Sequence, residues 1–208
     1  MIGGICYMKK KLIAVIALLF VCLAICKLYT QTNHYGVMTS GLSHIHRNTN
    51  DYALIYSDES SETSTELNLN DLESNVGKII WQKDKQYIEI TSINCKRLHK
   101  GEYDIYFKSH GVYDTNEGVL TTAVKHIRVD ENSFADTMMG DMFVNINGIS
   151  YPCERRSNSS IMYKDGDTFG FSFCLEEILG DDFTSNETVG TVEIRFENLI
   201  EHKWTKRK

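Results

Sequence analysis

The side chains best suited to bind a metal ion are those of His44 and His46, which are separated by one residue. In an extended segment this spacing places both imidazoles on one face, as in half of a metal site. No carboxylate lies nearer to them in the sequence than Asp51, and the flanking segment is polar. We therefore interpret the two histidines as part of a solvated linker and predict no metal site.

Three further histidines, His99, His110 and His126, are scattered through the chain. His126 alternates with Lys125 and Arg128, which is typical of an exposed strand edge. General acid–base catalysis requires a nucleophile or a carboxylate held beside the histidine, and the sequence shows neither. We interpret all three as surface residues.

Paired acids suggest calcium sites at three places: Asp136 with Asp141, Asp165 with Asp167, and Asp181 with Asp182. The twelve-residue loop pattern of a calcium-binding hand is absent. Aspartate also stabilises turns by accepting hydrogen bonds from nearby backbone, and we interpret the pairs in this way. Because the GxSxG, HExxH and GxGxxG patterns are also absent, the chain is predicted not to be an enzyme and to need no cofactor.

Three cysteines, Cys95, Cys153 and Cys174, lie in the polar part of the chain. Their odd number excludes a full disulfide framework, and their spacing does not suit zinc. One bridge with one free thiol remains compatible with the sequence. Cys153 is expected on the apolar face of its strand, whereas Cys174 alternates with phenylalanines and points away from them. We therefore expect no bridge between these two residues.

An apolar segment near the N-terminus determines where the rest of the chain is expected to work. Three lysines, Lys9 to Lys11, precede fifteen consecutive apolar residues from Leu12 to Cys26. A charged flank followed by an apolar run is typical of an export signal whose charged end stays in the cytoplasm. As a helix the run would be about 22 Å long, short for the roughly 30 Å core of a bilayer. We assign residues 1–29 to a signal peptide or a signal anchor.

Three outcomes stay open for this segment. A cleaved signal peptide requires small residues at the cut, and Ala24 alone offers one. A lipoprotein would be cut before Cys26, the candidate lipidation site, which follows a lipobox-like Leu-Ala-Ile sequence with Ile25 in place of a small residue. An uncleaved anchor requires no motif. The last two outcomes both tether the chain to the outer face of a membrane.

The charge of the exported part restricts its partners. The chain has 22 basic and 28 acidic residues, and its first 26 residues hold three lysines and no acid. The remainder therefore has 19 basic and 28 acidic residues, a net charge of −9. This excess argues against nucleic acid and anionic lipid surfaces as partners. The last seven residues, HKWTKRK, are basic and are predicted to form a solvated, frayed terminus.

Residues 30–77 are predicted to form an acidic stalk rich in serine and threonine. From residue 48 to residue 77 there is no Lys or Arg, while seven acids are present. Such a composition buries too little apolar surface to offset the entropy of ordering, so the segment should stay solvated and extended. The exception is Tyr52–Tyr56, which could dock as an edge strand or remain loose.

Beyond residue 77 the apolar residues recur at every second position, the period of a half-buried strand. Tyr103, Ile105 and Phe107 share one face in this way. Further strands are predicted over residues 79–81, 87–94, 120–129, 168–175 and 191–197. The three phenylalanines of the segment 168–175 share a face, which we assign to the core.

The strongest local prediction is a hairpin at Asn147-Gly148, because this pair is preferred in two-residue type I′ turns. Pairing outward sets Ile146 opposite Ile149, Val144 opposite Tyr151, and Met142 opposite Cys153, all on one apolar face. Asp165-Gly166 offers a second turn of the same kind.

Seven to nine short strands, with one helical turn near residues 175–179, predict an all-β fold. We expect an immunoglobulin-like antiparallel β-sandwich over residues 78–208, preceded by the N-terminal hydrophobic helix. Antibody domains have Cys…Trp…Cys spacing, whereas here Trp81 precedes Cys95. The fold is therefore immunoglobulin-like without the antibody pattern.

Three segments of this chain resemble a family of small exported immunoglobulin-like domains of Gram-positive bacteria. Their sequences are MFVNINGISY (142–151), YKDGDTFGFSF (163–173) and GTVEIRF (190–196). The family is lipoprotein-associated, has no known function, and is related in fold to a mycobacterial immunoprotective extracellular antigen. The resemblance covers about residues 79–199 and rests on loose patterns. It implies a fold and an exported location, and it brings no catalytic residue.

Together these features predict a membrane-tethered extracytoplasmic binding or interaction module without catalytic activity. The N-terminal segment would hold it in the cell membrane, and its partner would be an envelope or extracellular protein. The alternative is a structural cell-envelope spacer or an accessory subunit that acts through a protein partner. An exported hydrolase would require a polar cleft with converging His, Asp or Glu, which the sequence does not allow us to assemble.

Overall fold

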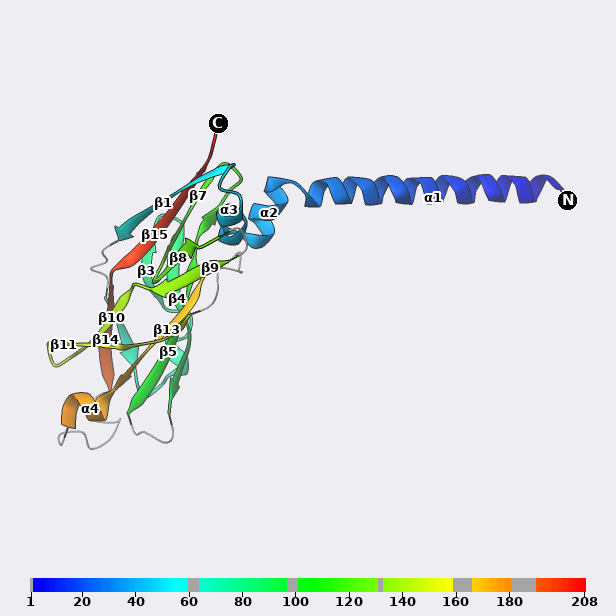
Figure 1. Cartoon of the computed structure of the whole chain (residues 1–208). Helices are drawn as coiled ribbons and strands as arrows, with labels where there is room; N and C mark the ends of the chain where they lie inside the picture. The colour runs from blue at the N-terminus through cyan, green and yellow to red at the C-terminus, as the bar shows by residue number, and fades with distance from the viewer. Residues whose placement is uncertain (1, 60–63, 97–100, 131–132, 159–165, 181–189) are drawn as a thin grey trace.

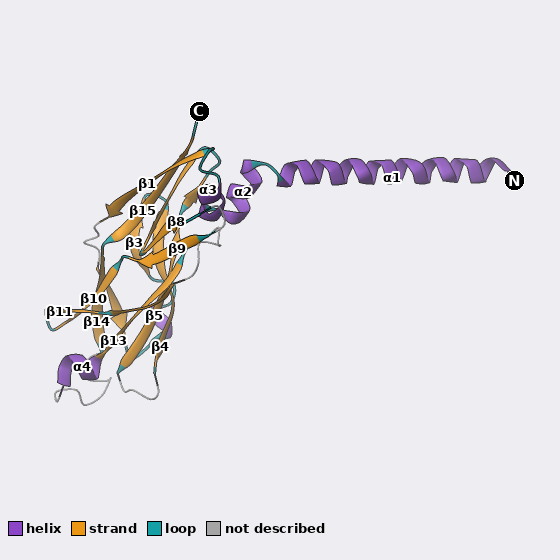
Figure 2. Cartoon of the chain, viewed as in Figure 1, coloured by secondary structure: helices purple, strands orange, loops and turns teal. Residues whose placement is uncertain are grey.

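The fold was analysed in a computed structural model that describes residues 2–59, 64–96, 101–130, 133–158, 166–180 and 190–208, with residues 2–14 and 158 described by their backbone alone. Strands dominate the molecule (Figure 1; Figure 2). The helical elements are α1 (Ile2–Thr30), α2 (Asn33–Ser40), α3 (Leu42–Arg47), α4 (Leu175–Leu179) and the 3-10 turn η1 (Glu73–Asn75). All strand pairs are antiparallel.

The strands in the described ranges form four sheets. In spatial order, the first sheet contains β1 (Tyr52–Glu59), β15 (Leu199–Lys206), β7 (Glu117–Thr122) and β6 (Val112–Tyr113). In the same order, the second contains β11 (Ile149–Pro152), β10 (Asp141–Ile146), β14 (Thr191–Glu197) and β2 (Ser64–Asn68). The third contains β12 (Glu154–Asn158), β13 (Thr168–Cys174), β5 (Glu102–His110), β4 (Gln86–Cys95) and β3 (Ile79–Lys83). The fourth pairs β8 (Val124–Arg128) with β9 (Phe134–Met138).

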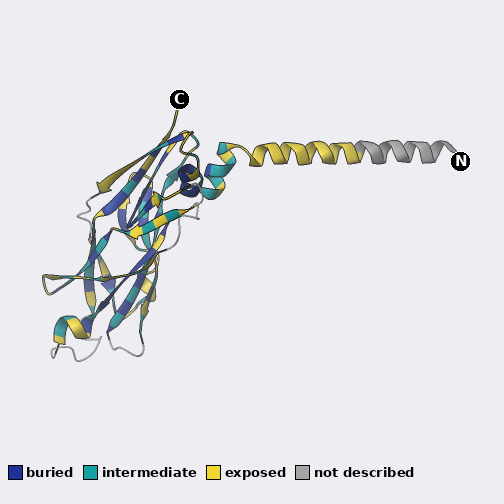
Figure 3. Cartoon of the chain, viewed as in Figure 1, coloured by how far each residue is buried: buried dark blue, intermediate teal, exposed yellow. Residues whose placement is uncertain are grey.

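The main hydrophobic core joins the second and third sheets, as in a β-sandwich (Figure 3). The second sheet contributes Val144 and Ile194, and the third contributes Ile88, Phe107 and Phe171. All five side chains are at most 2% exposed. A smaller cluster lies elsewhere and combines residues of α2 and α3 with residues of the first sheet. The molecule is thus mostly β, with antiparallel sheets packed around a shared core.

On β5 and β13 the period-two pattern correctly predicted which apolar residues are buried. On β5, Tyr103, Ile105 and Phe107 are fully buried, and the residues between them are half-buried. On β13 the three phenylalanines are at most 4% exposed, and the Phe107 and Phe169 rings stack with their centroids 5.6 Å apart. The predicted segment 120–129 is split between β7 and β8 by Ala123.

The hairpin at Asn147-Gly148 is confirmed. Both residues have positive φ, 54° and 80°, as a type I′ turn requires. Val144 pairs with Tyr151 and Ile146 with Ile149. The prediction of a wholly buried face is wrong on the second arm, because Ile149 is 57% exposed. Strand β11 is the edge of its sheet, so its side chains reach beyond the core.

The prediction of a solvated stalk over residues 30–77 does not hold for the part that the structure describes. Strand β1 pairs with β15 over eight residue pairs, and β2 pairs with β14. The prediction from composition failed because a polar segment can still join a sheet, where its backbone amides and carbonyls form hydrogen bonds with a neighbouring strand. Only a few of its side chains, such as Tyr52 and Leu67, are buried. Tyr52–Tyr56 therefore takes the docked alternative, as part of edge strand β1.

The basic C-terminus is also ordered, contrary to the prediction of a frayed tail. Residues up to Lys206 belong to β15, and His202 and Trp204 are fully buried. Trp204 packs with Val37 and Leu42 of the helical segment in the smaller cluster. The alternation of His202 and Trp204 with lysines is that of a strand with one buried face.

Helix α1 projects from the β-domain, and its described side chains are exposed (Figure 3). Helix α1 ends at Thr30, and Thr32 caps α2 by accepting a hydrogen bond from the Tyr35 backbone amide at 3.2 Å. Among residues with described side chains, no single helix has the length and hydropathy to cross a membrane. Segments Val15–Thr30 and Asn33–Ser40 meet that test only as a pair, bent by 69°.

Candidate functional site

The first candidate site is a cleft of about 430 Å³ beside α4, at the end of the β-domain away from α2 and α3 (Figure 1). Its walls come from β5, β11, β12, β13 and α4. The lining residues are Glu102, Pro152, Glu154, Arg156, Ser172, Phe173, Cys174, Glu176, Glu177 and Ile178. Four of them are glutamates and one is an arginine, so the lining is acidic.

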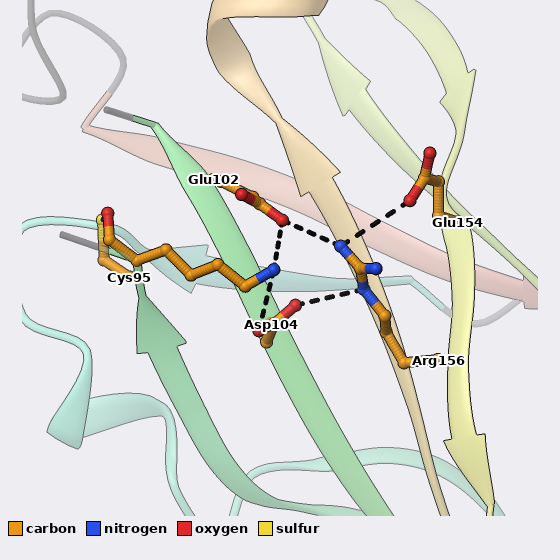
Figure 4. A network of polar contacts seen from close by, with 6 residues as sticks. Cys95, Glu102, Asp104, Glu154 and Arg156 are labelled. Carbon is orange, nitrogen blue, oxygen red and sulfur yellow. Dashed lines mark hydrogen bonds and ion pairs between the residues drawn. The ribbon is translucent and has the colours of Figure 1, made fainter. Parts of the chain in front are cut away.

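Arg156 organises one wall of this cleft (Figure 4). Its Nη2 lies 2.8 Å from Glu102 Oε1 and 3.6 Å from Glu154 Oε2. Its Nε lies 3.3 Å from Asp104 Oδ1. Lys96 approaches the same carboxylates, bonding Glu102 and lying 3.5 Å from Asp104. One guanidinium therefore connects three carboxylates.

The alternation of side chains along β5 determines on which face of the sheet this network lies. Glu102 and Asp104 point away from the core because Tyr103 and Ile105 between and beside them point into it. Strand β13 aligns Ser172 with Asp104 on one side and with Glu154 on the other. The hydrogen bond from Lys96 to Glu102 raises the pKa of that lysine, against the opposing effect of desolvation. The wall thus holds charged, hydrogen-bonded groups in a fixed array.

The described lining of the cleft holds charged and polar groups suited to binding. Ser172 and Cys174 line it, but none of the lining residues is a histidine that could activate them. The glutamates outnumber the arginine, so the cleft favours a cationic group over an anionic one. The alternating acids of β5 are visible in the sequence, but the sequence could not show that Arg156 pairs with them or that α4 lines the same cleft.

The second candidate is a buried cluster of three histidines. His126 on β8 is fully buried, with Nδ1 2.6 Å from Asp136 Oδ1 and Nε2 2.7 Å from Asp167 Oδ2. Carboxylates only accept hydrogen bonds, so both ring nitrogens donate and the ring is an imidazolium. Burial lowers the pKa of His126, but the hydrogen bonds and charges of Asp167 and Asp136 outweigh burial and raise the pKa above its ordinary value.

His46 of α3 and His202 of β15 surround this cation. Ring centroids lie 5.4 Å apart for His126 and His202, and 6.5 Å from His46 to each of the others. His202 Nε2 donates to the Val124 carbonyl at 2.9 Å. Its Nδ1 and the Nε2 of His46 are buried and have no hydrogen-bond partner among the described residues. Both rings are therefore neutral beside a charged one.

Sequence reasoning missed this cluster. His126 was predicted on an exposed edge and His46 in a linker, yet both are at most 2% exposed. Asp136 and Asp167, interpreted as turn formers, bind His126 instead. His44 and His46 lie on helix α3, and the prediction that both belong to a solvated linker is wrong for the buried His46.

Other predicted residues lie elsewhere. His110 is half-buried, with Nε2 2.8 Å from Glu89 Oε1. His99, Asp165, Asp181 and Asp182 lie outside the described residues, as does most of the turn preceding Gly166. Within the described ranges, no group of three or more His, Cys, Asp or Glu has the geometry to hold a metal ion.

Among the residues whose side chains the structure describes, Cys22, Cys26, Cys153 and Cys174 form no disulfide bond. Cys153 packs against the main core, and burial raises the pKa of its thiol to about 12, so it is not a reactive thiolate. Cys26, the candidate lipidation site, lies in α1 with its side chain exposed. Cys174 lines the charged cleft.

Comparisons with protein-family models, with curated proteins and with solved structures found no match to this chain.

Proposed function

We propose that this protein is a membrane-tethered, extracytoplasmic binding module with no catalytic activity. The single observation that carries the proposal is the position of the charged cleft. It lies at the end of the β-domain away from α2 and α3, and these follow directly on the apolar helix α1 (Figure 1). A domain held in the cell membrane by α1 would thus present the cleft away from the tether.

The chemistry of the cleft favours a protein partner that offers lysine or arginine side chains. Glu176 and Glu177 are exposed on α4, while Glu102 and Glu154 are already engaged by Arg156. A cationic segment of an envelope or extracellular protein could pair with the two exposed glutamates at the mouth of the cleft. The overall negative charge supports the same polarity of partner.

An immunoglobulin-like fold is part of this proposal. The antiparallel sheets packed around one core support it, as does the resemblance to small exported domains over residues 79–199. Such sandwiches display binding residues at the ends of their sheets, which is where α4 lies. The resemblance also supports an exported location.

Fractionation tests the tether. The chain should be found in the membrane fraction, because the apolar run from Leu12 to Cys26 has no clear cleavage site. A fatty-acid probe then separates the two tethered forms. Label that disappears in Cys26→Ser indicates a lipoprotein, and absence of label indicates an uncleaved anchor. A chain found wholly in the medium contradicts membrane tethering.

Crosslinking in intact cells tests the cleft. A photo-reactive residue at Glu177 should give a discrete adduct, and the same residue at exposed Ser57 on β1 serves as the matched control. Adding Glu176→Lys to the first variant should abolish the adduct by charge repulsion. Equal adducts at both positions would contradict binding in the cleft. A partner captured only at Ser57 would favour the structural spacer, whose contacts need not involve the cleft.

A further inference from the structure

The helical segment that follows α1 is fastened to the β-domain by apolar residues and one histidine. Val37, Leu42 and Ile45 are at most 1% exposed and pack with Tyr52 and Trp204. The next residue, His46, is 2% exposed. Its ring lies between those of Tyr56, His126, Phe134 and His202, with centroid distances of 5.8 to 6.5 Å. The packing of α3 against the β-domain therefore buries an imidazole ring among aromatic rings.

The surroundings of His46 disfavour a positive charge on it. The titratable and charged groups around it are Tyr56 of β1, Lys125, His126 and Arg128 of β8, Asp136 of β9, Asp167 before β13, His202 of β15, and Arg47 and His44 on α3 itself. Both carboxylates are already bonded to the His126 imidazolium. The other charged groups are cations, so a second imidazolium would be repelled by them, and the buried Nε2 of His46 has no hydrogen-bond partner among the described residues.

We propose that His46, His126 and His202 form an acid-sensitive latch that holds α2 and α3 on the β-domain at neutral pH and releases them when the pH falls. A proton on His46 can be hydrated only if α3 leaves its seat. Release would separate Leu42 and Ile45 from Trp204 and turn the chain between α1 and β1 into a loose tether. The inference concerns the tether and does not depend on what the cleft binds.

The pKa directions agree with this geometry. Burial, and then the charges of His202 and His126, lower the pKa of His46 to about 3. Burial, and then the charge of His126, lower the pKa of His202 to about 4. In the released segment His46 regains its ordinary pKa near 6.5, so the released form binds more protons than the docked form below that pH. Acid therefore shifts the equilibrium toward release.

Trp204 is a built-in reporter of the latch. The chain has two tryptophans, and Trp81 lies in the main core, away from the helical segment. In a Trp81→Phe background, the full chain in detergent micelles would be titrated from pH 7 to pH 3. Trp204 emission should shift to the red as the pH falls, at a pH where the far-ultraviolet circular dichroism of the sheets is unchanged.

Two variants make the assignment specific. His46→Phe keeps an aromatic ring among Tyr56 and Phe134 but cannot be protonated, so its emission midpoint should move to lower pH by about one unit or more. His110→Gln, which changes a histidine of the third sheet, should titrate like the parent. The latch is contradicted if Trp204 emission stays constant to pH 3, if emission and circular dichroism change together, or if the two variants titrate alike.

Discussion

At the scale of single residues, His126 is a fully buried histidine held between two carboxylates. Asp167 is the more buried partner, with 4% of its side chain exposed against 19% for Asp136. A buried ion pair gains little net stability over an apolar pair, but removing one partner leaves a charge uncompensated. The two carboxylates are therefore not equivalent.

Asp167→Asn should lower the pKa of His126 and destabilise the protein by about 3 kcal/mol or more, because the imidazolium loses its more buried acceptor. Asp136→Asn should also lower the pKa of His126 and destabilise the protein, but by less than Asp167→Asn. The raised pKa stabilises the fold below the unfolded value and loses that effect as the pH rises through the folded pKa. Histidine titration by NMR and denaturant unfolding measure both quantities. Equal effects of the two variants would contradict this ranking.

The neutral histidines predict how stability depends on pH. His46 and His202 have lowered pKa values, so between about pH 6.5 and pH 4 the unfolded chain takes up protons that the folded chain refuses. Their effect is absent above pH 6.5, and stability falls as the pH drops through this window. The contribution of His126 is constant there, because its raised pKa lies above the window.

The unfolding free energy should therefore decrease with falling pH by up to about 2.7 kcal/mol per unit, the limit for two protons. Urea melts at pH 7, 6, 5 and 4 measure the slope. His46→Phe should reduce this slope by about half, because one of the two histidines with a lowered pKa is lost. A stability that rises on acidification over this range would contradict the assignment.

The error at His126 shows what hydropathy alone cannot determine. On β8 the buried face carries Val124 and His126, while Ile127 is 43% exposed. A pattern based on hydropathy points the isoleucine inward and the histidine outward. The inversion is stabilised by Asp136 and Asp167, which come from other segments, so no local window of sequence contains its cause.

At the scale of elements, turns and strands with one apolar face were predicted well. Strand β14 has the predicted bounds, and the Asn147-Gly148 turn has the predicted register. Both follow from interactions within a few residues. The roles of β1 and β2 were not predicted, because their stability comes from backbone pairing with strands near the C-terminus.

Two glycines with positive φ provide a matched test of the turns. At Gly148 a Cβ would meet open space, so Gly148→Ala should cost only the backbone strain, about 1 kcal/mol. At Gly166, where φ is 102°, a Cβ would lie 1.9 Å from the Ser109 carbonyl oxygen. Gly166→Ala should therefore cost more than about 2 kcal/mol, since strain and a backbone clash add. Denaturant melts of both variants give the comparison, and a smaller loss at Gly166 would contradict it.

At the scale of the whole molecule, the ordered unit begins well before residue 78. Strands β1 and β2 join sheets whose other strands lie beyond residue 100, and α2 and α3 cover Trp204. The boundary predicted from composition would cut through this unit.

A fragment of residues 31–208 should consequently be much more stable than a fragment of residues 78–208. The shorter fragment loses Tyr52 and Leu67, whose burial alone contributes on the order of 3–6 kcal/mol, and it exposes the edges of β14 and β15. Thermal melts followed by circular dichroism compare the two. Equal melting temperatures of the two fragments would contradict this expectation and support a domain that begins at residue 78.

The pairing of β1 with β15, and of β2 with β14, also determines when the protein can fold. The described strands of residues 52–68 pair with strands of residues 191–206, so the first and second sheets stay incomplete until those later residues have been synthesised. Contacts this distant in sequence make folding slow, since a long loop must close before any pairing energy is gained. A chain that crosses a membrane unfolded would benefit from this delay, because its early strands cannot close into a finished domain before the last ones arrive. Loss of the final ten residues would leave β1 and β7 without their shared neighbour, and the nascent chain open to aggregation.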